Sequence, residues 1–431
     1  MKLIRKIWFI LVSVVILTAC SDDVPEKSIP SEVKGRTLLS YIVSNNGGLD
    51  LDKYLKANVV DMYKGLFANK EPSVLVVYFR PKNRTGETLT VPSILKFVTD
   101  GKGNINGRRS LAASELVVKS DYDNASELFA KIVEEAEVIP FGDENANATD
   151  PKVMTKALLK MKELAPSENY GLTMGSHATG WMFQKEVQKR SFGDDNGYHI
   201  NISQLANVLE TVFGQQKLDF ILFDACMMAQ AEVAYELRNS THKIVASTFE
   251  TPVDGHPYNI ILHQLYAKDV NYQYLCDTFA ETNKRKKLWG ALSAINCDKI
   301  EELADWMKIN LPLYDKQLTR SLARKTAAYG RGFFDGLSYD VVDVFRQLEI
   351  DNFPELKELV DNVVIAKSML TRDEVGINYK TFTINPARYS GMGMYLPFIS
   401  GNVQYDGVYW DEYYINSFGW SKAVGWEKFK N

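Results

Sequence analysis

Short apolar segments alternate with helical patterns along most of this chain of 431 residues. Most of the apolar segments show no regular polar alternation, which is typical of strands that are buried on both faces of a sheet. The segments between them have the length and periodicity of helices that cross from one parallel strand to the next. The sequence therefore predicts an α/β fold with a mostly parallel central sheet covered by helices on both faces.

This alternation also gives the expected elements. The expected strands are Thr37–Val43, Ser73–Phe79, Tyr170–Gly175, Leu218–Asp224, Lys243–Thr248, Leu292–Asn296 and Gly393–Phe398. The expected helices are Leu51–Leu66, Ala125–Glu135, Asp150–Leu164, Ile202–Phe213, Met227–Arg238, Pro257–Leu265, Lys299–Ile309 and Pro354–Met369. The polar segments Phe141–Thr149 and Gln184–Asn196 are expected to be loops. Because the alternation weakens beyond residue 298, we predict one domain over residues 37–298 and a C-terminal region over residues 299–431.

The N-terminus has the pattern of an export signal. Three basic residues precede the apolar stretch Ile7–Ala19, which is too short to span a bilayer as a helix. The sequence Leu-Thr-Ala-Cys, which ends at Cys20, resembles the bacterial lipobox, in which the cysteine is acylated. We therefore expect a signal peptide over residues 1–19, a lipidated Cys20 with a flexible tether over residues 20–36, and a lipid anchor at the outer membrane or cell surface. An ordinary signal cleaved near Ala19 is the alternative.

The charged residues exclude one class of partner. Lys and Arg number 50 and Asp and Glu number 54, which gives a formal charge of −4, and no long basic run occurs. Binding of nucleic acid needs a concentrated basic face, so nucleic acid is not expected as a partner.

Three cysteines follow Cys20, namely Cys226, Cys276 and Cys297. Exported proteins usually pair or avoid thiols, and an odd number leaves at least one thiol free. None of the three has the spacing of a structural zinc site, so no metal is expected. We expect Cys276 and Cys297 to be core residues.

Two expected strands end in residues suited to nucleophilic catalysis. His177 follows the strand Tyr170–Gly175, and Cys226 follows the strand Leu218–Asp224. Catalytic groups gather beyond the carboxyl ends of parallel strands, and a nearby imidazole makes a thiolate accessible near neutral pH. The sequence therefore predicts that His177 is a general base and Cys226 a nucleophile. A structural histidine and an inert core cysteine are the alternatives.

Two further features favour such a pair. The expected helix Met227–Arg238 begins beside Cys226, and the positive end of its dipole would lower the pKa of the thiol. The backbone N–H groups of Cys226 and of the residues after His177 are available donors for an oxyanion. The other histidines do not follow a strand and precede a Gly-Trp turn as His177 does. They are His199, His242, His256 and His263.

Three ordered motifs resemble the clostripain family of cysteine peptidases. They are Ser-His-x-x-Gly-Trp at 176–181, Asp-Ala-Cys-Met-Met at 224–228 and Ala-Ser-x-x-Glu-Thr-Pro-x-Asp-Gly-x-Pro-Tyr at 246–258. Weaker resemblance extends to Asn-Asn-Gly-Gly-Leu at 45–49 and to the segment 390–397. The resemblance implies a caspase-like αβα sandwich over residues 37–298 and an endopeptidase, expected to be monomeric, that cleaves protein or peptide substrates after Arg or Lys.

The resemblance also assigns roles to single residues. It implies that His177 is the base, that Cys226 is the nucleophile, and that Asp224 and Asp254 line the pocket for the basic side chain. For Asp224, capping of the helix after Cys226 is the alternative. The family usually has Gly where this chain has Ala178, and Ala resists backbone angles that Gly accepts. The N–H of Ala178 still serves as an oxyanion donor if its conformation is ordinary.

Processing and cofactors form the last group of expectations. Resembling proteins cut their own chain in the region of Gln184–Asn196, so self-cleavage after Lys189 or Arg190 is expected, with plain solvated surface as the alternative. Some members depend on calcium, but no EF-hand loop occurs here, and no cofactor is expected. One alternative function is a catalytically silent surface lipoprotein that binds peptides or glycans in the same cleft. Another is a hydrolase that uses two carboxylates, for which no distinguishing arrangement exists.

Overall fold

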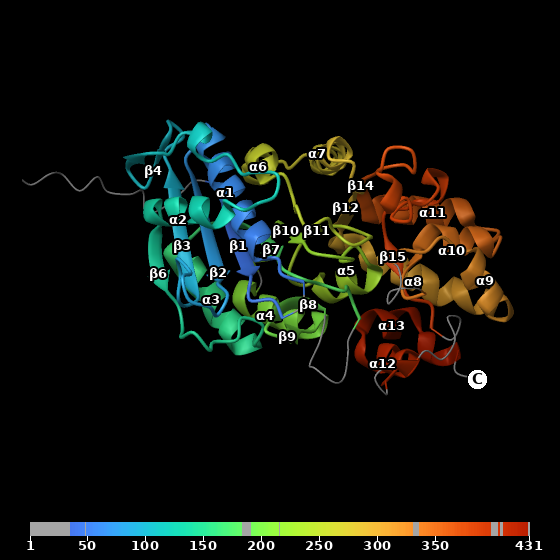
Figure 1. Cartoon of the computed structure of the whole chain (residues 1–431). Coiled ribbons are helices and arrows are strands. Elements are labelled where there is room, and N and C mark those ends of the chain that lie inside the picture. The colour runs from blue at the N-terminus through green and yellow to red at the C-terminus, as the bar shows by residue number, and fades with distance from the viewer. Residues whose placement is uncertain are drawn as a thin grey trace, which may run out of the picture.

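The computed structural model of the protein describes residues 35–47, 49–182, 191–214, 216–330, 336–397, 404–405 and 408–429. In this part of the chain a large sheet lies between two layers of helices, and a further group of helices packs at one end of it (Figure 1). The predicted α/β fold is thereby confirmed. The expected signal peptide, Cys20, Lys189 and Arg190 lie outside the described residues.

The central sheet has eleven strands among the described residues. They are β1 (Arg36–Val43), β2 (Ser73–Arg80), β3 (Ser93–Thr99), β4 (Asn104–Ile105), β5 (Arg108–Arg109), β6 (Glu137–Pro140), β7 (Asn169–Gly175), β10 (Phe220–Asp224), β11 (Lys243–Ala246), β12 (Ala291–Asn296) and β14 (Val364–Met369). Their order is β14-β12-β11-β10-β7-β1-β2-β3-β4-β5, and β6 pairs with β3. The five central strands, β2, β1, β7, β10 and β11, are parallel, and antiparallel strands flank them on both sides.

The α-helices of the described residues form the two layers beside this sheet and the further group at its end. They are α1 (Asp52–Ala68), α2 (Ala125–Glu135), α3 (Pro151–Leu164), α4 (Ile202–Phe213), α5 (Ala231–Leu237), α6 (Tyr258–Tyr266), α7 (Tyr272–Arg285), α8 (Ile300–Asn310), α9 (Arg320–Lys325), α10 (Val341–Gln347), α11 (Phe353–Val363), α12 (Trp410–Ser417) and α13 (Gly419–Val424). One apolar cluster joins one face of the sheet to α1, α2, α6 and α7, and another joins the opposite face to α3, α4, α5 and α8. Because the central strands are apolar on both sides, each layer buries its own stripe of helix residues.

The sequence also explains where helices begin. The helix α3 starts after Asp150, whose carboxylate accepts hydrogen bonds from the N–H groups of Lys152 and Val153, and Pro151 occupies the first helical position. This arrangement satisfies N–H groups that have no partner within the helix.

Two expected helices are wrong in extent. The helix α5 begins at Ala231 rather than at Met227, because Met227 has a left-handed backbone with φ of 58° that no helix can contain. The expected helix Pro354–Met369 ends at Val363, and the next six residues form the edge strand β14. The β-branched residues Val364 and Ile365 suit an extended backbone, and β12 supplies the pairing partner.

Other differences concern short or polar elements. The expected loop Gln184–Asn196 contains the strand β8 (Phe192–Asp195), which pairs with β9 (Tyr198–Ile200). The expected strand Gly393–Phe398 is reduced to β15 (Gly393–Met394), which pairs with β13 (Tyr339–Asp340) outside the central sheet. The elements β3 and α7 were not predicted. The apolar run of the buried strand β3 is interrupted by Lys96, and α7 is polar on one side.

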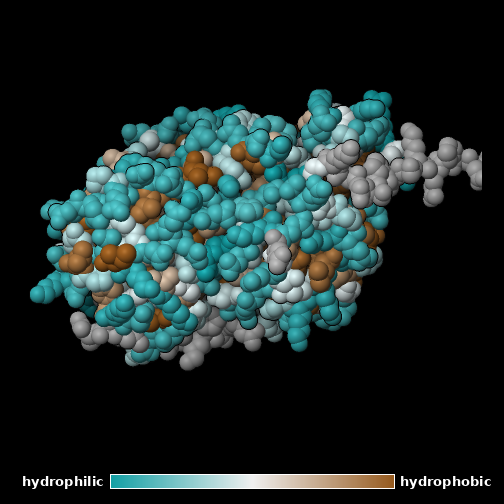
Figure 2. Space-filling view, turned by 180° about the vertical axis from the view of Figure 1, so that it is seen from behind, coloured by the Kyte–Doolittle hydropathy of each residue, from teal (hydrophilic) through white to brown (hydrophobic). Residues whose placement is uncertain are grey.

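One face of the molecule carries no large apolar patch (Figure 2). The view from behind the molecule is mostly hydrophilic, with apolar residues in small separate groups (Figure 2). Among the described residues, no helix has both the length and the apolar character needed to cross a membrane.

The C-terminal helices pack directly against the turn that follows His177. The ring of Trp181 is fully buried and contacts Tyr395, Trp410 and Tyr414, with ring centroids 4.7, 5.5 and 5.0 Å apart. One apolar cluster therefore extends from this turn into α12 and α13. The domain boundary expected near residue 298 stays a prediction.

A buried carboxyl group lies beside these rings. Glu232 Oε1 accepts hydrogen bonds from the Tyr395 N–H at 2.8 Å and from the Tyr414 hydroxyl at 2.7 Å. Burial raises the pKa of Glu232 to about 7. The unfolded chain ionises this carboxyl at lower pH than the folded protein does, so Glu232 destabilises the fold increasingly as the pH rises from about 4.5 to about 7.

We expect Glu232→Gln to stabilise the protein at pH 8 and not at pH 4.5. Glutamine keeps an oxygen acceptor for both hydrogen bonds and carries no charge that must be buried. The gain at pH 8 is up to about 3 kcal/mol, at about 1.4 kcal/mol per unit of pKa shift. Thermal unfolding of parent and variant between pH 4.5 and 8 checks this. A difference in Tm that does not change with pH would contradict it.

Candidate active site

The sheet register places His177 and Cys226 at the same edge. The strands β7 and β10 are adjacent and parallel, and Gly175 lies opposite Asp224 in their last registered pair. His177 and Cys226 each follow that pair by two residues. The two side chains therefore emerge from the carboxyl ends of neighbouring strands, where catalytic groups of parallel sheets gather.

The imidazole of His177 is fixed by a backbone carbonyl. Its Nε2 lies 2.8 Å from the carbonyl oxygen of Leu49, and His177 is half-buried. Because a carbonyl oxygen can only accept, Nε2 carries the hydrogen. The other ring nitrogen, Nδ1, is then the one that can accept a proton in neutral histidine.

The thiol of Cys226 is partly buried and lies beside the segment after β11. Its Sγ accepts a hydrogen bond from the N–H of Thr251 at 3.4 Å. Burial raises the pKa of Cys226 to about 12, and the negative charges of Glu250 and Asp224 add to the rise. Within the described ranges, the hydrogen bonds of His177 and Cys226 lead to Leu49 and Thr251 rather than to each other. Nucleophilic attack by Cys226 consequently needs a base that removes its proton.

The expected help from a helix dipole is absent. Because α5 begins only at Ala231, Cys226 lies in a turn and not at a helix N-terminus. The dipole acts mainly within the first turn, so the prediction that it lowers the pKa of Cys226 is wrong. The turn is instead tight, with Met227 in the left-handed region and its N–H bonded to the carbonyl of Phe249 at 2.9 Å.

The expected oxyanion donors are the backbone N–H groups of Ala178 and Cys226. Among the described residues, the N–H groups of Ala178 and Cys226 make no backbone hydrogen bond. Ala178 forms an isolated antiparallel bridge with Phe192 and does not have a positive φ, whereas Gly180 does, with φ of 69°. Alanine therefore fits the backbone at the position where glycine is more usual, and the oxyanion role of its N–H stays a prediction.

Asp224 is part of a buried hydrogen-bonded group. Its carboxylate accepts from Asn58 Nδ2 at 2.8 Å and from the Tyr258 hydroxyl, and burial raises its pKa. The same burial lowers the pKa of the neighbouring His256. The alternative that Asp224 caps a helix is wrong, because α5 starts several residues later and the carboxylate points to α1 instead.

Asp254 lies at a cavity and already has a cationic partner. The cavity has a volume of about 450 Å³ and is lined by α1, the segment 117–122, the segment 254–260 and the end of α7. Asp254 Oδ2 lies 2.5 Å from Nζ of Lys286. Asn58 and Gly255 line the same cavity, and a Cβ on Gly255 would lie 2.6 Å from the Asp224 carboxylate. Asp224 is thus behind the wall of the cavity that Asp254 faces.

The remaining histidines have other partners. His199 is bonded to the carbonyl of Gly193, His242 lies 2.8 Å from Asp298, and His263 is bonded to the carbonyl of Ile260. Cys276 and Cys297 are buried and unpaired, as expected of core residues. In the described ranges, no group of three or more potential ligand side chains is placed to hold a metal ion.

Sequence reasoning missed the partners of the expected pair. Leu49 acts through its carbonyl, so its side chain gave no signal, although it lies in the Asn-Asn-Gly-Gly-Leu segment. Thr251 lies within the third motif and acts through its N–H. Lys286 is one of several lysines near the end of α7, and only the fold brings it to Asp254.

A model of the clostripain family matches residues 40–430. The chain belongs to this family. It is a cysteine protease, as its motifs predict. No curated protein matches it at a significant level.

Solved structures of clostripain-family proteases share the fold. An inactive zymogen C11 protease from Parabacteroides distasonis is 21% identical, with a TM-score of 0.65 over 92% of this chain and 99% of that one. A secreted C11 cysteine protease from Bacteroides thetaiotaomicron, iotapain, is 19% identical, with a TM-score of 0.66 over 91% of this chain and 99% of that one. A secreted C11 cysteine protease from Bacteroides thetaiotaomicron in complex with an irreversible peptide inhibitor is 20% identical, with a TM-score of 0.65 over 91% of this chain and 100% of that one. The caspase-like α/β architecture extends over almost the whole of these proteins.

Proposed function

We propose that this clostripain-family protease is an endopeptidase that uses His177 and Cys226 as a catalytic dyad. The observation that carries the proposal is that both residues lie two positions beyond the last registered pair of two adjacent parallel strands. In addition, Nε2 of His177 is hydrogen-bonded to the Leu49 carbonyl, which leaves Nδ1 to accept a proton. Nδ1 of His177 takes the proton of Cys226, and Sγ attacks the peptide carbonyl. The N–H groups of Ala178 and Cys226 stabilise the oxyanion. His177 then protonates the leaving amine, and water hydrolyses the thioester.

We expect Cys226→Ala and His177→Ala each to lower peptide hydrolysis by at least about 10³-fold with Tm within a few degrees of the parent. Either change removes activation of the nucleophile, and neither removes a large buried side chain. Turnover of fluorogenic peptides checks this. Near-normal turnover by Cys226→Ala would show that another residue is the nucleophile.

Alkylation distinguishes this function from a silent lipoprotein that binds peptides or glycans. Since burial raises the pKa of Cys226, its reaction with iodoacetamide at pH 7 depends on a base. In a dyad, Cys226 reacts faster than the buried Cys276 and Cys297, and His177→Ala slows the reaction. A silent binding cleft predicts equal rates with and without His177.

We further propose that the cavity beside Asp254 receives a basic substrate side chain, which gives cleavage after Arg or Lys. Asp254 is a partly exposed carboxylate, and Asp224 adds negative charge behind Asn58 and Gly255. A substrate guanidinium can be held by such a carboxylate through two hydrogen bonds. To reach Asp254, the substrate must first displace Lys286, which reduces the affinity for basic peptides.

We expect Lys286→Gln to lower KM for an arginine peptide by about two- to fivefold, with kcat unchanged, since a partly exposed ion pair contributes about 0.2–1 kcal/mol. Asp254→Asn should raise that KM. Lys284→Gln is the matched control, because Lys284 lies in the last turn of α7, two residues before Lys286, but pairs with Glu374 at 2.9 Å. Parallel assays with a leucine peptide complete the test. Equal cleavage after Leu and Arg by the parent would refute basic selectivity, and an unchanged KM in Lys286→Gln would refute competition.

Two proposals concern residues outside the described ranges. We propose that Cys20 carries a lipid that anchors the protein in the cell envelope, at the outer membrane or cell surface. We also propose that the enzyme cuts its own chain after Lys189 or Arg190. Support for this comes from the described residues on either side, because Thr179 and Ser191 are bonded through their backbones close to His177.

We expect mass spectrometry of the purified parent protein to show two fragments, which separate only after denaturation. The same measurement on the Cys226→Ala variant should show one intact chain. A basic residue near the active site matches the selectivity proposed above. Cleavage that persists in Cys226→Ala would identify a foreign protease, and full activity of an uncut parent would show that the cut is unnecessary.

A further inference from the structure

The segment that follows the expected cleavage site is bonded to the backbone of His177. The N–H of Gly193 donates to the carbonyl of His177 at 2.8 Å, and the N–H of Thr179 donates to the carbonyl of Ser191 at 3.1 Å. The segment is also anchored from the far side, where Asp195 forms a buried ion pair with Arg80 at 3.0 Å. The strand β8 is therefore held in a fixed place beside His177.

Asp194, within β8, connects this strand to the loop between β1 and α1. Its carboxylate is 2% exposed and accepts hydrogen bonds from the N–H groups of Gly197 at 2.8 Å and Gly47 at 3.2 Å. A turn such as the one before Gly197 needs only the first of these bonds. The bond to Gly47 joins residues 147 positions apart and reaches the loop that supplies the carbonyl partner of His177.

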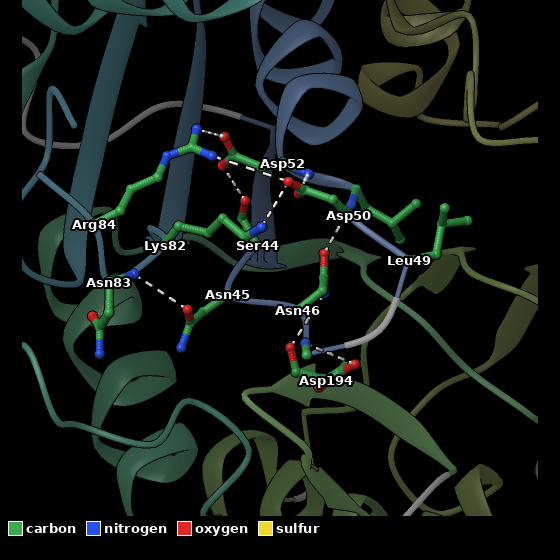
Figure 3. Close-up of polar contacts among 12 residues, drawn as sticks. Ser44, Asn45, Asn46, Leu49, Asp50, Asp52, Lys82, Asn83, Arg84 and Asp194 are labelled. Atoms are coloured by element: carbon green, nitrogen blue, oxygen red, sulfur yellow. Dashed lines mark hydrogen bonds and ion pairs between the residues drawn. The ribbon is translucent and has the colours of Figure 1, made fainter. Parts of the chain in front are cut away.

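Asn46 completes the connection (Figure 3). Its Nδ2 donates to the carbonyl of Asp194 at 3.2 Å, and its Oδ1 accepts from the N–H of Leu51 at 3.2 Å. Leu49 therefore lies between Gly47 and Leu51. The N–H of Gly47 is bonded to the Asp194 carboxylate. The N–H of Leu51 is bonded to Asn46, which is bonded in turn to the backbone carbonyl of Asp194. The far end of the loop is held separately by the ion pair of Asp50 with Lys82 at 2.6 Å.

The position of the Leu49 carbonyl decides the orientation of the His177 ring. A single hydrogen bond to Nε2 leaves the ring free to turn if its acceptor moves. A displacement of about 1 Å at a catalytic group can cost about 10²-fold in rate. The contacts of Asp194 hold the loop that carries the Leu49 carbonyl. The strand β8, which contains Asp194, is also bonded to the backbone of His177.

We propose that Asp194 is a positioning residue that holds the Leu49 carbonyl, and through it His177, in the catalytic orientation. This inference rests on the function proposed for His177. Asp194 does not contact the reacting atoms. It acts by making the loop between β1 and α1 and the strand β8 one rigid support.

The test compares Asp194→Ala and Asp194→Asn in the full chain. For Asp194→Ala we expect kcat to fall by about 30- to 100-fold, with KM within about threefold of the parent, because binding groups are untouched. Asp194→Asn keeps one oxygen acceptor and should recover part of the loss. Alkylation of Cys226 by iodoacetamide at pH 7 should slow in the same order, since it depends on His177 and needs no substrate.

Asp150→Ala is the matched control. Asp150 also accepts two backbone N–H groups, but at the start of α3. The Asp150→Ala variant should have a lower Tm than the parent and an unchanged kcat. A kcat for Asp194→Ala within about threefold of the parent, or a rise in KM alone, overturns the inference. If Asp194→Ala does not fold, parent-like kcat and alkylation in Asp194→Asn overturn it. Full turnover by His177→Ala would instead refute the proposed function itself.

Discussion

The parallel pairing of β7 with β10 is the interaction on which the candidate active site depends. Five registered residue pairs bring Gly175 opposite Asp224, and each chain then leaves the sheet at the same level. Because paired strands in a sheet lie about 4.8 Å apart, two residues that follow the last pair by the same number of positions leave the sheet from neighbouring points. A shift of register by one residue would turn one of the two side chains to the opposite face of the sheet.

The sequence predicted this core well because its signals are local. Uniform apolar strands, helical periodicity and the turns after β7 and β10 specified the α/β fold and placed His177 and Cys226 at one edge. It predicted less well where tertiary contacts override local preference. Val364–Met369 continues a helical pattern but forms a strand because β12 has an open edge. Met227 begins an apolar helical run, yet its positive φ delays the helix to Ala231.

The parts of the site that sequence reasoning missed share one property. Leu49 and Thr251 contribute backbone groups, and backbone groups leave no trace in residue type. The pairing of Lys286 with Asp254 depends on the packing of α7 beside the segment after β11, which no local pattern encodes. The proposed catalytic side chains could therefore be named from sequence, whereas the backbone and charged groups that contact the site required the fold.

The order of strands in the sheet has a consequence for how the chain divides. All strands before residue 183 that belong to the sheet lie on one side of the boundary between β7 and β10, and all those after residue 190 lie on the other. The chain therefore consists of two contiguous half-sheets whose boundary within the sheet is a single ladder of backbone hydrogen bonds. Each half carries one member of the proposed pair, His177 in the first and Cys226 in the second. The protein therefore has the topology of a split enzyme. Two separately made polypeptides, one ending before residue 191 and one beginning after residue 182, could assemble by pairing β7 with β10 and form the site between them.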